Sequence, residues 1–111
     1  RLLREFAVLE LDLIRVAGKS KAVRIFALLG DAALRQTPNF HALLVRHEAM
    51  LAAYRARRWQ EAQRLLQACL TLDTRQTRLR AFYGLYARRM QAHVSNPPGP
   101  DWDGSFTAAS K

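Results

Sequence analysis

The fold is decided first by residues 13–26, LIRVAGKSKAVRIF, in which two β-forming runs flank a short polar turn. Gly18, Lys19 and Ser20 form that turn, and glycine supplies the positive φ that a tight reversal often needs. The pattern predicts a terminal β-hairpin over residues 1–30.

The two predicted strands differ in how their apolar side chains are arranged. In the first, residues 6–16, leucines alternate with Glu10 and Asp12 until Ile14 and Val16 place apolar groups on the opposite face. That change indicates either a bulge or a strand covered on both sides. The return strand, residues 22–29, is apolar on both faces and is typical of a strand buried in a larger sheet. Because an isolated hairpin is marginal in water, we expect it to pack on helices, gain a third strand or pair with another copy.

Helices are predicted over the next part of the chain. After Gly30, Asp31 is a plausible N-cap for a short connector, and Thr37-Pro38 marks the start of a helix that runs to about residue 57. Two further helices are expected over about 59–72 and 75–93, each with apolar residues at steps of three or four. The first two are joined by a turn of one or two residues, which makes them antiparallel neighbours.

A proline-rich tail follows the helices. The breaker cluster Asn96-Pro97-Pro98-Gly99-Pro100 ends the helical part and begins an extended tail, residues 96–111. Because the tail carries Trp102, we expect it to dock on the rest of the chain through this residue. The predicted fold class is α+β and mostly α: a β-hairpin, a unit of about three antiparallel helices over 31–95, and an extended tail.

The helical unit resembles a tetratricopeptide repeat over about one repeat plus one helix. The family's usual glycine in the first helix is replaced by Leu51, and its closing proline by Thr74. The matching positions, which include small residues that allow close helix packing, are Tyr54, Trp59, Ala62, Leu66 and Cys69. This resemblance implies a helical hairpin, and it carries an alternative function: a small tetratricopeptide-like module for protein–protein interaction.

The hairpin and the tail resemble another family. The turn Val16-Ala17-Gly18-Lys19, followed by the apolar strand 22–26, is similar to the last hairpin of class III nucleotide cyclase domains. The ending Pro-Pro…Asp-Trp-Asp-Gly…Ser-Lys is similar to the C-termini of bacterial membrane-anchored adenylate cyclases, in which a short tetratricopeptide-like segment follows the catalytic domain. The resemblance covers nearly the whole chain. It implies the C-terminal end of a class III adenylate or guanylate cyclase, which acts in cyclic AMP signalling as a lyase.

The resemblance also implies where the chemistry lies. Two Mg²⁺ or Mn²⁺ ions on paired aspartates activate the 3′-hydroxyl of ATP in such enzymes, and those residues belong to a catalytic domain upstream of Arg1. We therefore expect no catalytic residue, no metal ligand and no cofactor in this segment, whose role is structural or regulatory. Asp12 is interpreted as part of a strand's polar face. The family's phosphate-contacting lysine is replaced by Ala17, and Lys19 or Lys21 is the candidate to contact phosphate instead.

Two partners follow from the cyclase hypothesis: the upstream catalytic domain and a second copy, since class III active sites form between two cyclase domains. The interaction-module hypothesis instead predicts a peptide or acidic partner and centres on Tyr54, Trp59, Trp102, Arg55 and Arg58. A concave groove lined by arginines would favour this alternative, and a groove filled by the tail would argue against it. The arginines in question are Arg55, Arg58, Arg78 and Arg89.

Composition limits the remaining functions. The 111 residues carry a net charge of +9, but the 18 basic residues are scattered, so we expect no nucleic-acid binding. Cys69 is the only cysteine, which excludes an internal disulfide. His47 lies on an apolar stripe and is interpreted as a packed histidine. No apolar run approaches the roughly 20 residues of a membrane span. Because the sequence begins at Arg1, we expect it to start mid-protein, on the cytoplasmic side of a parent anchored in the bacterial inner membrane.

Overall fold

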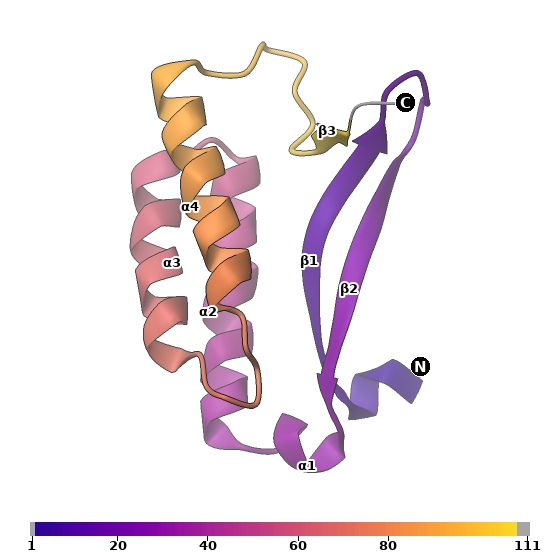
Figure 1. The fold of residues 1–111 in the computed structure, drawn as a ribbon, viewed down its shortest axis with the longest axis vertical. Coiled ribbons are helices and arrows are strands. Elements are labelled where there is room, and N and C mark those ends of the chain that lie inside the picture. Colours follow the sequence, from indigo (N-terminus) through magenta and orange to yellow (C-terminus); the bar gives the residue numbers. More distant parts are fainter. Residues whose placement is uncertain (1, 109–111) are drawn as a thin grey trace.

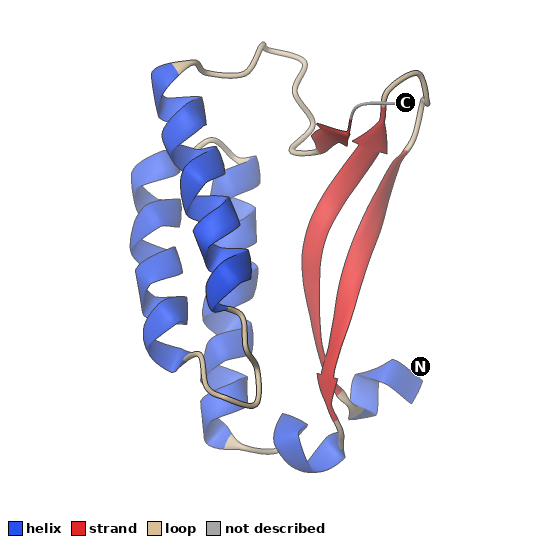
Figure 2. Cartoon of the chain, in the orientation of Figure 1, coloured by secondary structure: helices blue, strands red, loops and turns tan. Residues whose placement is uncertain are grey.

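A computed structural model describes residues 2–108 of the chain and confirms the predicted α+β class (Figure 1). A hairpin and a short third strand stand beside a bundle of three long helices (Figure 2). In chain order the elements are η1 (Leu2–Glu5), β1 (Ala7–Val16), β2 (Ala22–Gly30), α1 (Ala32–Arg35), α2 (Pro38–Arg55), α3 (Trp59–Leu72), α4 (Arg80–Ser95) and β3 (Phe106–Ala108).

The hairpin forms where the sequence predicts it. β1 and β2 pair antiparallel, and Gly18 adopts φ +86°, the left-handed conformation that glycine tolerates without steric cost. The register shifts between Glu10 and Asp12, so that Leu11 has no partner on β2. Of the two explanations offered for the change of apolar face, a bulge or a strand covered on both sides, the structure has the β-bulge. Below the bulge Ala7 and Leu9 are buried, whereas above it Asp12 is the buried residue. The extra residue therefore turns Asp12 toward the interior.

The tail adds a third strand. β3 pairs in parallel with the end of β1, with Phe106 opposite Ile14 and Ala108 opposite Val16, so that the sheet has the order β2-β1-β3. A further backbone hydrogen bond runs from Ala17 N to Ala108 O at 3.0 Å. The tail up to Ala108 therefore lies beside the hairpin turn, although the two segments are about 90 residues apart in the sequence. Residues 109–111 of the predicted tail lie outside the described residues.

The helix starts have local causes. The side chain of Thr37 accepts a hydrogen bond from Phe40 N at 3.1 Å, with Pro38 in the first turn of α2, and Asp31 caps α1 through Leu34 N. Three residues, 56–58, join α2 and α3, and Arg57 among them adopts φ +66°. The expected turn of one or two residues was therefore slightly too short, because α2 ends at residue 55.

The last helix begins five residues later than predicted, at Arg80 instead of 75. Asp73 is the reason: its carboxylate accepts hydrogen bonds from the Thr77 hydroxyl at 2.5 Å and from Leu79 N at 2.9 Å. These bonds hold residues 73–79 in a compact loop, since a short acidic side chain competes with the helix for backbone N–H groups.

The core lies between the helices and the inner part of β1. The helical pair α2 and α3 packs closely over Ala62 and Cys69, which are both fully buried. The largest buried side chains are Leu9, Phe40, Leu43, His47, Met50, Tyr54, Leu66, Cys69, Tyr83, Tyr86 and Met90. Apolar and aromatic side chains from four elements thus form one cluster, which fixes the helices against the hairpin.

β2 differs from its prediction. It was expected to be buried in a larger sheet, but in this chain it is an edge strand and most of its side chains are exposed. Val23 is 59% exposed, Phe26 55% and Leu28 62%. The helices contact mainly β1, and within residues 2–108 no strand pairs with the outer edge of β2.

Candidate functional site

The hairpin turn carries the candidate phosphate contact. Lys19 is exposed, and its backbone N–H bonds to Val16 O at 2.9 Å, which closes the turn. Ala17 is exposed beside it. Its methyl group offers no charge, so the cations near the turn come from the neighbouring side chains Lys19, Lys21 and Arg15. A compact, exposed and positively charged turn is suited to an anionic group.

Arg15 connects the turn to the tail. Its guanidinium donates through Nη1 to Ser20 O and through Nη2 to Asp103 Oδ2, the latter at 2.5 Å. Asp103 also accepts hydrogen bonds from the Ser105 hydroxyl and from Ser105 N. The Ser105 hydroxyl and Arg15 hold the pKa of Asp103 well below its usual range. Asp103 is therefore ionised at neutral pH and ties the turn to the tail.

Trp102 docks the tail on the helical unit. Its ring lies 5.5 Å from that of Tyr54, 5.9 Å from Trp59 and 5.0 Å from His93, measured between centroids. The indole N–H donates to Ser105 O at 2.8 Å, and the Arg57 guanidinium lies 5.6 Å above the ring. The tail is thus held at the end of α2, where the chain turns into α3, and it covers Tyr54 and one side of Trp59.

His93 completes this aromatic cluster. It stacks on Trp59 with 4.9 Å between centroids and lies 3.2 Å from the Tyr54 hydroxyl through Nε2. Partial burial, together with the charges of Arg89 and Arg57, lowers the pKa of His93. A neutral imidazole therefore fills the space between the rings.

The arginines of the interaction-module hypothesis do not share one groove. Arg55 points at the sheet, with Nη2 at 2.9 Å from Glu10 Oε2, in an ion pair that lacks the angle of a hydrogen bond. Arg58 pairs with Glu61 on α3, and Arg78 lies in the loop before α4, where its Nε donates to Arg75 O. Arg89 turns inward, as described next. Only Arg58 and Arg78 are left at the surface, beside different hollows.

Asp12 is not on a solvent-exposed polar face, as the sequence suggested, but takes part in a buried ion pair. Arg89 Nη1 lies 3.0 Å from Asp12 Oδ1 and 2.9 Å from Oδ2, and the Tyr86 hydroxyl donates to Oδ1 at 2.9 Å. The two charged side chains are only 11% and 12% exposed. The bulge at Leu11 caused this difference, because it rotated Asp12 toward α4.

His47 holds the bulge from α2. It is fully buried, as expected for a packed histidine, with Nε2 at 2.6 Å from Glu10 O and Nδ1 at 2.7 Å from the Tyr83 hydroxyl. The Tyr86 hydroxyl bonds to the next carbonyl, Leu11 O, at 3.0 Å. Burial lowers the pKa of His47. The single Tyr86 hydroxyl proton is shared between Leu11 O and Asp12 Oδ1. Side chains of α2 and α4 therefore hold the backbone at the bulge.

Three further observations concern metal binding, membrane spanning and the reactivity of the cysteine. Within residues 2–108, no group of three or more His, Cys, Asp or Glu side chains is arranged to hold a metal ion, and no helix is long and apolar enough to cross a membrane. Cys69 is buried, and burial raises the pKa of its thiol, so it is not an activated nucleophile.

Comparisons of the chain with known protein families, curated proteins and solved structures found no match.

Sequence reasoning missed the two links between distant segments, Arg15 to Asp103 and Asp12 to Arg89. Each joins positions more than 70 residues apart, and neither has a local signal. The one available hint was the acidic residue Asp12 within an apolar strand beside a possible bulge.

Proposed function

We propose that this chain is the C-terminal portion of a class III adenylate cyclase, which converts ATP to cyclic AMP. The hairpin would be the last of the catalytic domain, and the helical unit with its tail would be an appendage that holds the hairpin in position. The metal ions and the aspartates that bind them would belong to the preceding catalytic domain.

One observation supports this proposal above all. The resemblance covers three consecutive segments, and these segments pack as a single unit: the hairpin, the helical unit and the tail. Trp102 sits on α2 and α3, β3 extends the sheet beside the turn, and Arg15 joins the turn to Asp103. An independent binding module would need no such contacts with the hairpin turn. An appendage that positions the turn requires them.

Within this proposal the chain itself contributes a cationic turn. Lys19 would place its ammonium near the triphosphate, in the role that the missing lysine at position 17 fills in the family. The backbone of the turn is held by Arg15 on one side and by Ala108 O on the other, so the lysine would approach from a fixed support.

The first experiment measures cyclic nucleotide production by the full-length parent with Mn²⁺ and ATP or GTP, beside a version truncated after Gly30. We expect truncation to abolish or deregulate activity. Trp102→Ala, which undocks the tail, should have the same direction of effect, and Leu85→Ala on the exposed side of α4 is the matched control. Unchanged activity after truncation would refute the appendage role. A full-length parent without cyclase activity would contradict the proposal as a whole.

A second experiment tests the turn. Lys19→Ala should raise the KM for ATP more than it lowers kcat, because a ground-state phosphate contact is lost. Lys21→Ala distinguishes the two lysines of the turn. If neither substitution changes KM, then the turn does not contact the substrate.

A further inference from the structure

The outer edge of β2 lacks the usual protection of an edge strand. Natural edges are short, charged or interrupted by proline, because free backbone groups otherwise recruit another strand. β2 has nine residues, and its one charged residue, Arg24, is held by Glu10 of the same chain at 2.7 Å. Within the described residues no strand pairs with this edge.

Apolar side chains on both faces of β2 are also uncovered. Phe26 and Leu28 are more than half exposed, as is Val23, and Ile25 is 41% exposed. Large apolar side chains exposed together on one strand are typical of an interaction site. Both faces of the strand are affected, so the partner must extend the sheet and not merely lie on one face.

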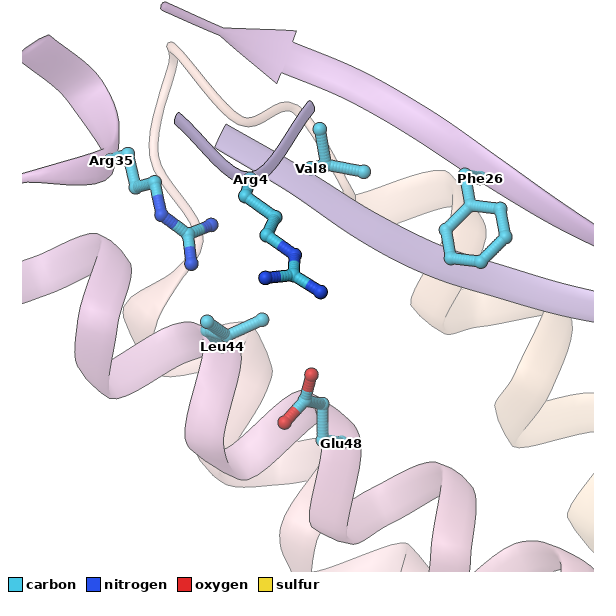
Figure 3. A pocket seen from close by; sticks show the side chains of 6 residues that line it. All are labelled: Arg4, Val8, Phe26, Arg35, Leu44 and Glu48. Atoms are coloured by element: carbon cyan, nitrogen blue, oxygen red, sulfur yellow. The ribbon is translucent and has the colours of Figure 1, made fainter. Parts of the chain in front are cut away.

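Two hollows adjoin the edge and can receive side chains from such a partner. The first, of about 250 Å³, lies between the hairpin and α2; Phe26 and Val8 form its sheet side and Leu44 its helix side (Figure 3). Arg4, Arg35 and Glu48 surround it with charge (Figure 3). The second, of about 320 Å³, is lined by Leu28, Leu29 and Gly30 at the C-terminal end of the strand, together with Phe6 and Asp31.

We infer that β2 pairs with β2 of a second copy of this chain, antiparallel, with the two-fold axis at Phe26. In this register each residue before Phe26 lies opposite the residue equally far after it on the partner. Lys21, five positions before, then faces Asp31, five positions after, at both ends of the paired segment. Between these two ion pairs every residue except Arg24 is apolar or glycine.

Charge complementarity selects this arrangement. A parallel pairing in register would place Lys21 beside Lys21 and Asp31 beside Asp31, and like charges directly opposite one another are destabilising. Lys21 and Asp31 are both exposed in the single chain, and Asp31 uses Oδ1 to cap α1. A two-fold axis is also the commonest symmetry of homodimers. The result is a continuous sheet of six strands with the order β3-β1-β2-β2-β1-β3. This inference does not rest on the proposed cyclase function.

The test is sedimentation velocity of the 111-residue chain from micromolar to submillimolar concentration. We expect a monomer–dimer equilibrium that Phe26→Asp abolishes, since two carboxylates would meet at the axis. Val94→Asp, at an apolar site on α4 that is 48% exposed against 55% for Phe26, should leave the dimer intact. Thermal melting followed by circular dichroism checks that both variants stay folded. A chain that remains monomeric throughout, or a dimer that survives Phe26→Asp, would overturn the inference; either outcome would assign the edge to another occupant, such as a preceding part of a longer protein.

A charge exchange tests the register. Lys21→Glu and Asp31→Lys should each raise the dimer Kd about tenfold, because each creates two like-charge pairs. An equimolar mixture of the two variants should regain the wild-type Kd, since both pairs in the mixed dimer are then of opposite charge. If mixing does not restore association, the proposed register is wrong. The measurement needs no cyclase activity, so its failure is independent of the proposed function.

Discussion

Arg89 is predicted to be the residue whose loss most weakens the link between the helices and the sheet. Arg89→Met keeps much of the side chain's length but removes the charge that compensates Asp12. Because the pair is only 11–12% exposed, water cannot replace the lost partner. Breaking a buried ion pair from one side typically costs about 3–5 kcal/mol. The Tyr86 hydroxyl and Leu13 N still donate to the carboxylate, so we expect a loss near the lower end, about 3 kcal/mol.

The expected loss is a large part of the total stability. A domain of this size has a free energy of unfolding of roughly 6–17 kcal/mol, and about 3 kcal/mol should lower Tm by at least roughly 10 °C. Urea unfolding followed by tryptophan fluorescence is a suitable assay, because Trp59 and Trp102 both lie in the aromatic cluster. Arg88→Met is the matched control: it is the preceding residue of the same helix and is exposed.

A double-mutant cycle makes the argument refutable. Asp12→Asn removes the charge that requires Arg89, so the double variant Asp12→Asn/Arg89→Met should lose less than the sum of the two single losses, by about 1–3 kcal/mol. A loss below about 1 kcal/mol for Arg89→Met, or strict additivity in the cycle, would show that the pair is not the link described here.

Three further predictions concern pH, the turn and the tail. Because burial lowers the pKa of His47, the unfolded chain binds more protons, so stability should fall as pH drops below about 6.5; His47→Gln should flatten that slope, and His93→Asn only in part, since His93 is less buried. Gly18→Ala should cost about 1 kcal/mol through its positive φ alone, because nothing lies within 4 Å of the added Cβ, and Gly99→Ala, equally open but without a positive φ, should be neutral in the same urea titration. Trp102→Ala should cost about 2 kcal/mol, roughly half the value for a fully buried tryptophan, and should expose the ring of the remaining tryptophan to acrylamide quenching; an unchanged midpoint would mean that the tail is not docked in solution.

The sequence predicted those parts of the fold that have local causes. Gly18 in a polar turn between two β-forming runs specified the hairpin, and Thr37-Pro38 specified where α2 begins. The proline cluster specified where the helices stop. The sequence predicted the start of the last helix five residues too early. The hydrogen bonds of Asp73 with Thr77 and Leu79 depend on a loop geometry that apolar periodicity does not report.

The candidate site was less predictable. The sequence identified the turn with Lys19 and singled out Trp102, but not what holds either in place. Neither the contact of Arg15 with Asp103 nor the parallel pairing of β3 with β1 has a signature in any short window. Such contacts are chosen by the packing of the whole chain.

By itself, then, the sequence determined the elements and their order, because caps, turns and apolar periodicity act over a few residues. Only the tertiary structure decided which side chains meet. The bulge at Leu11 is the clearest case: one unpaired residue turned Asp12 from the expected solvent face toward Arg89. His47 and Tyr86 bind the carbonyl groups of Glu10 and Leu11 at the bulge. β2 likewise has the apolar pattern of a buried strand, yet it lies at the edge of the sheet. The helices contact mainly β1, and no strand within the described residues pairs with the outer edge of β2.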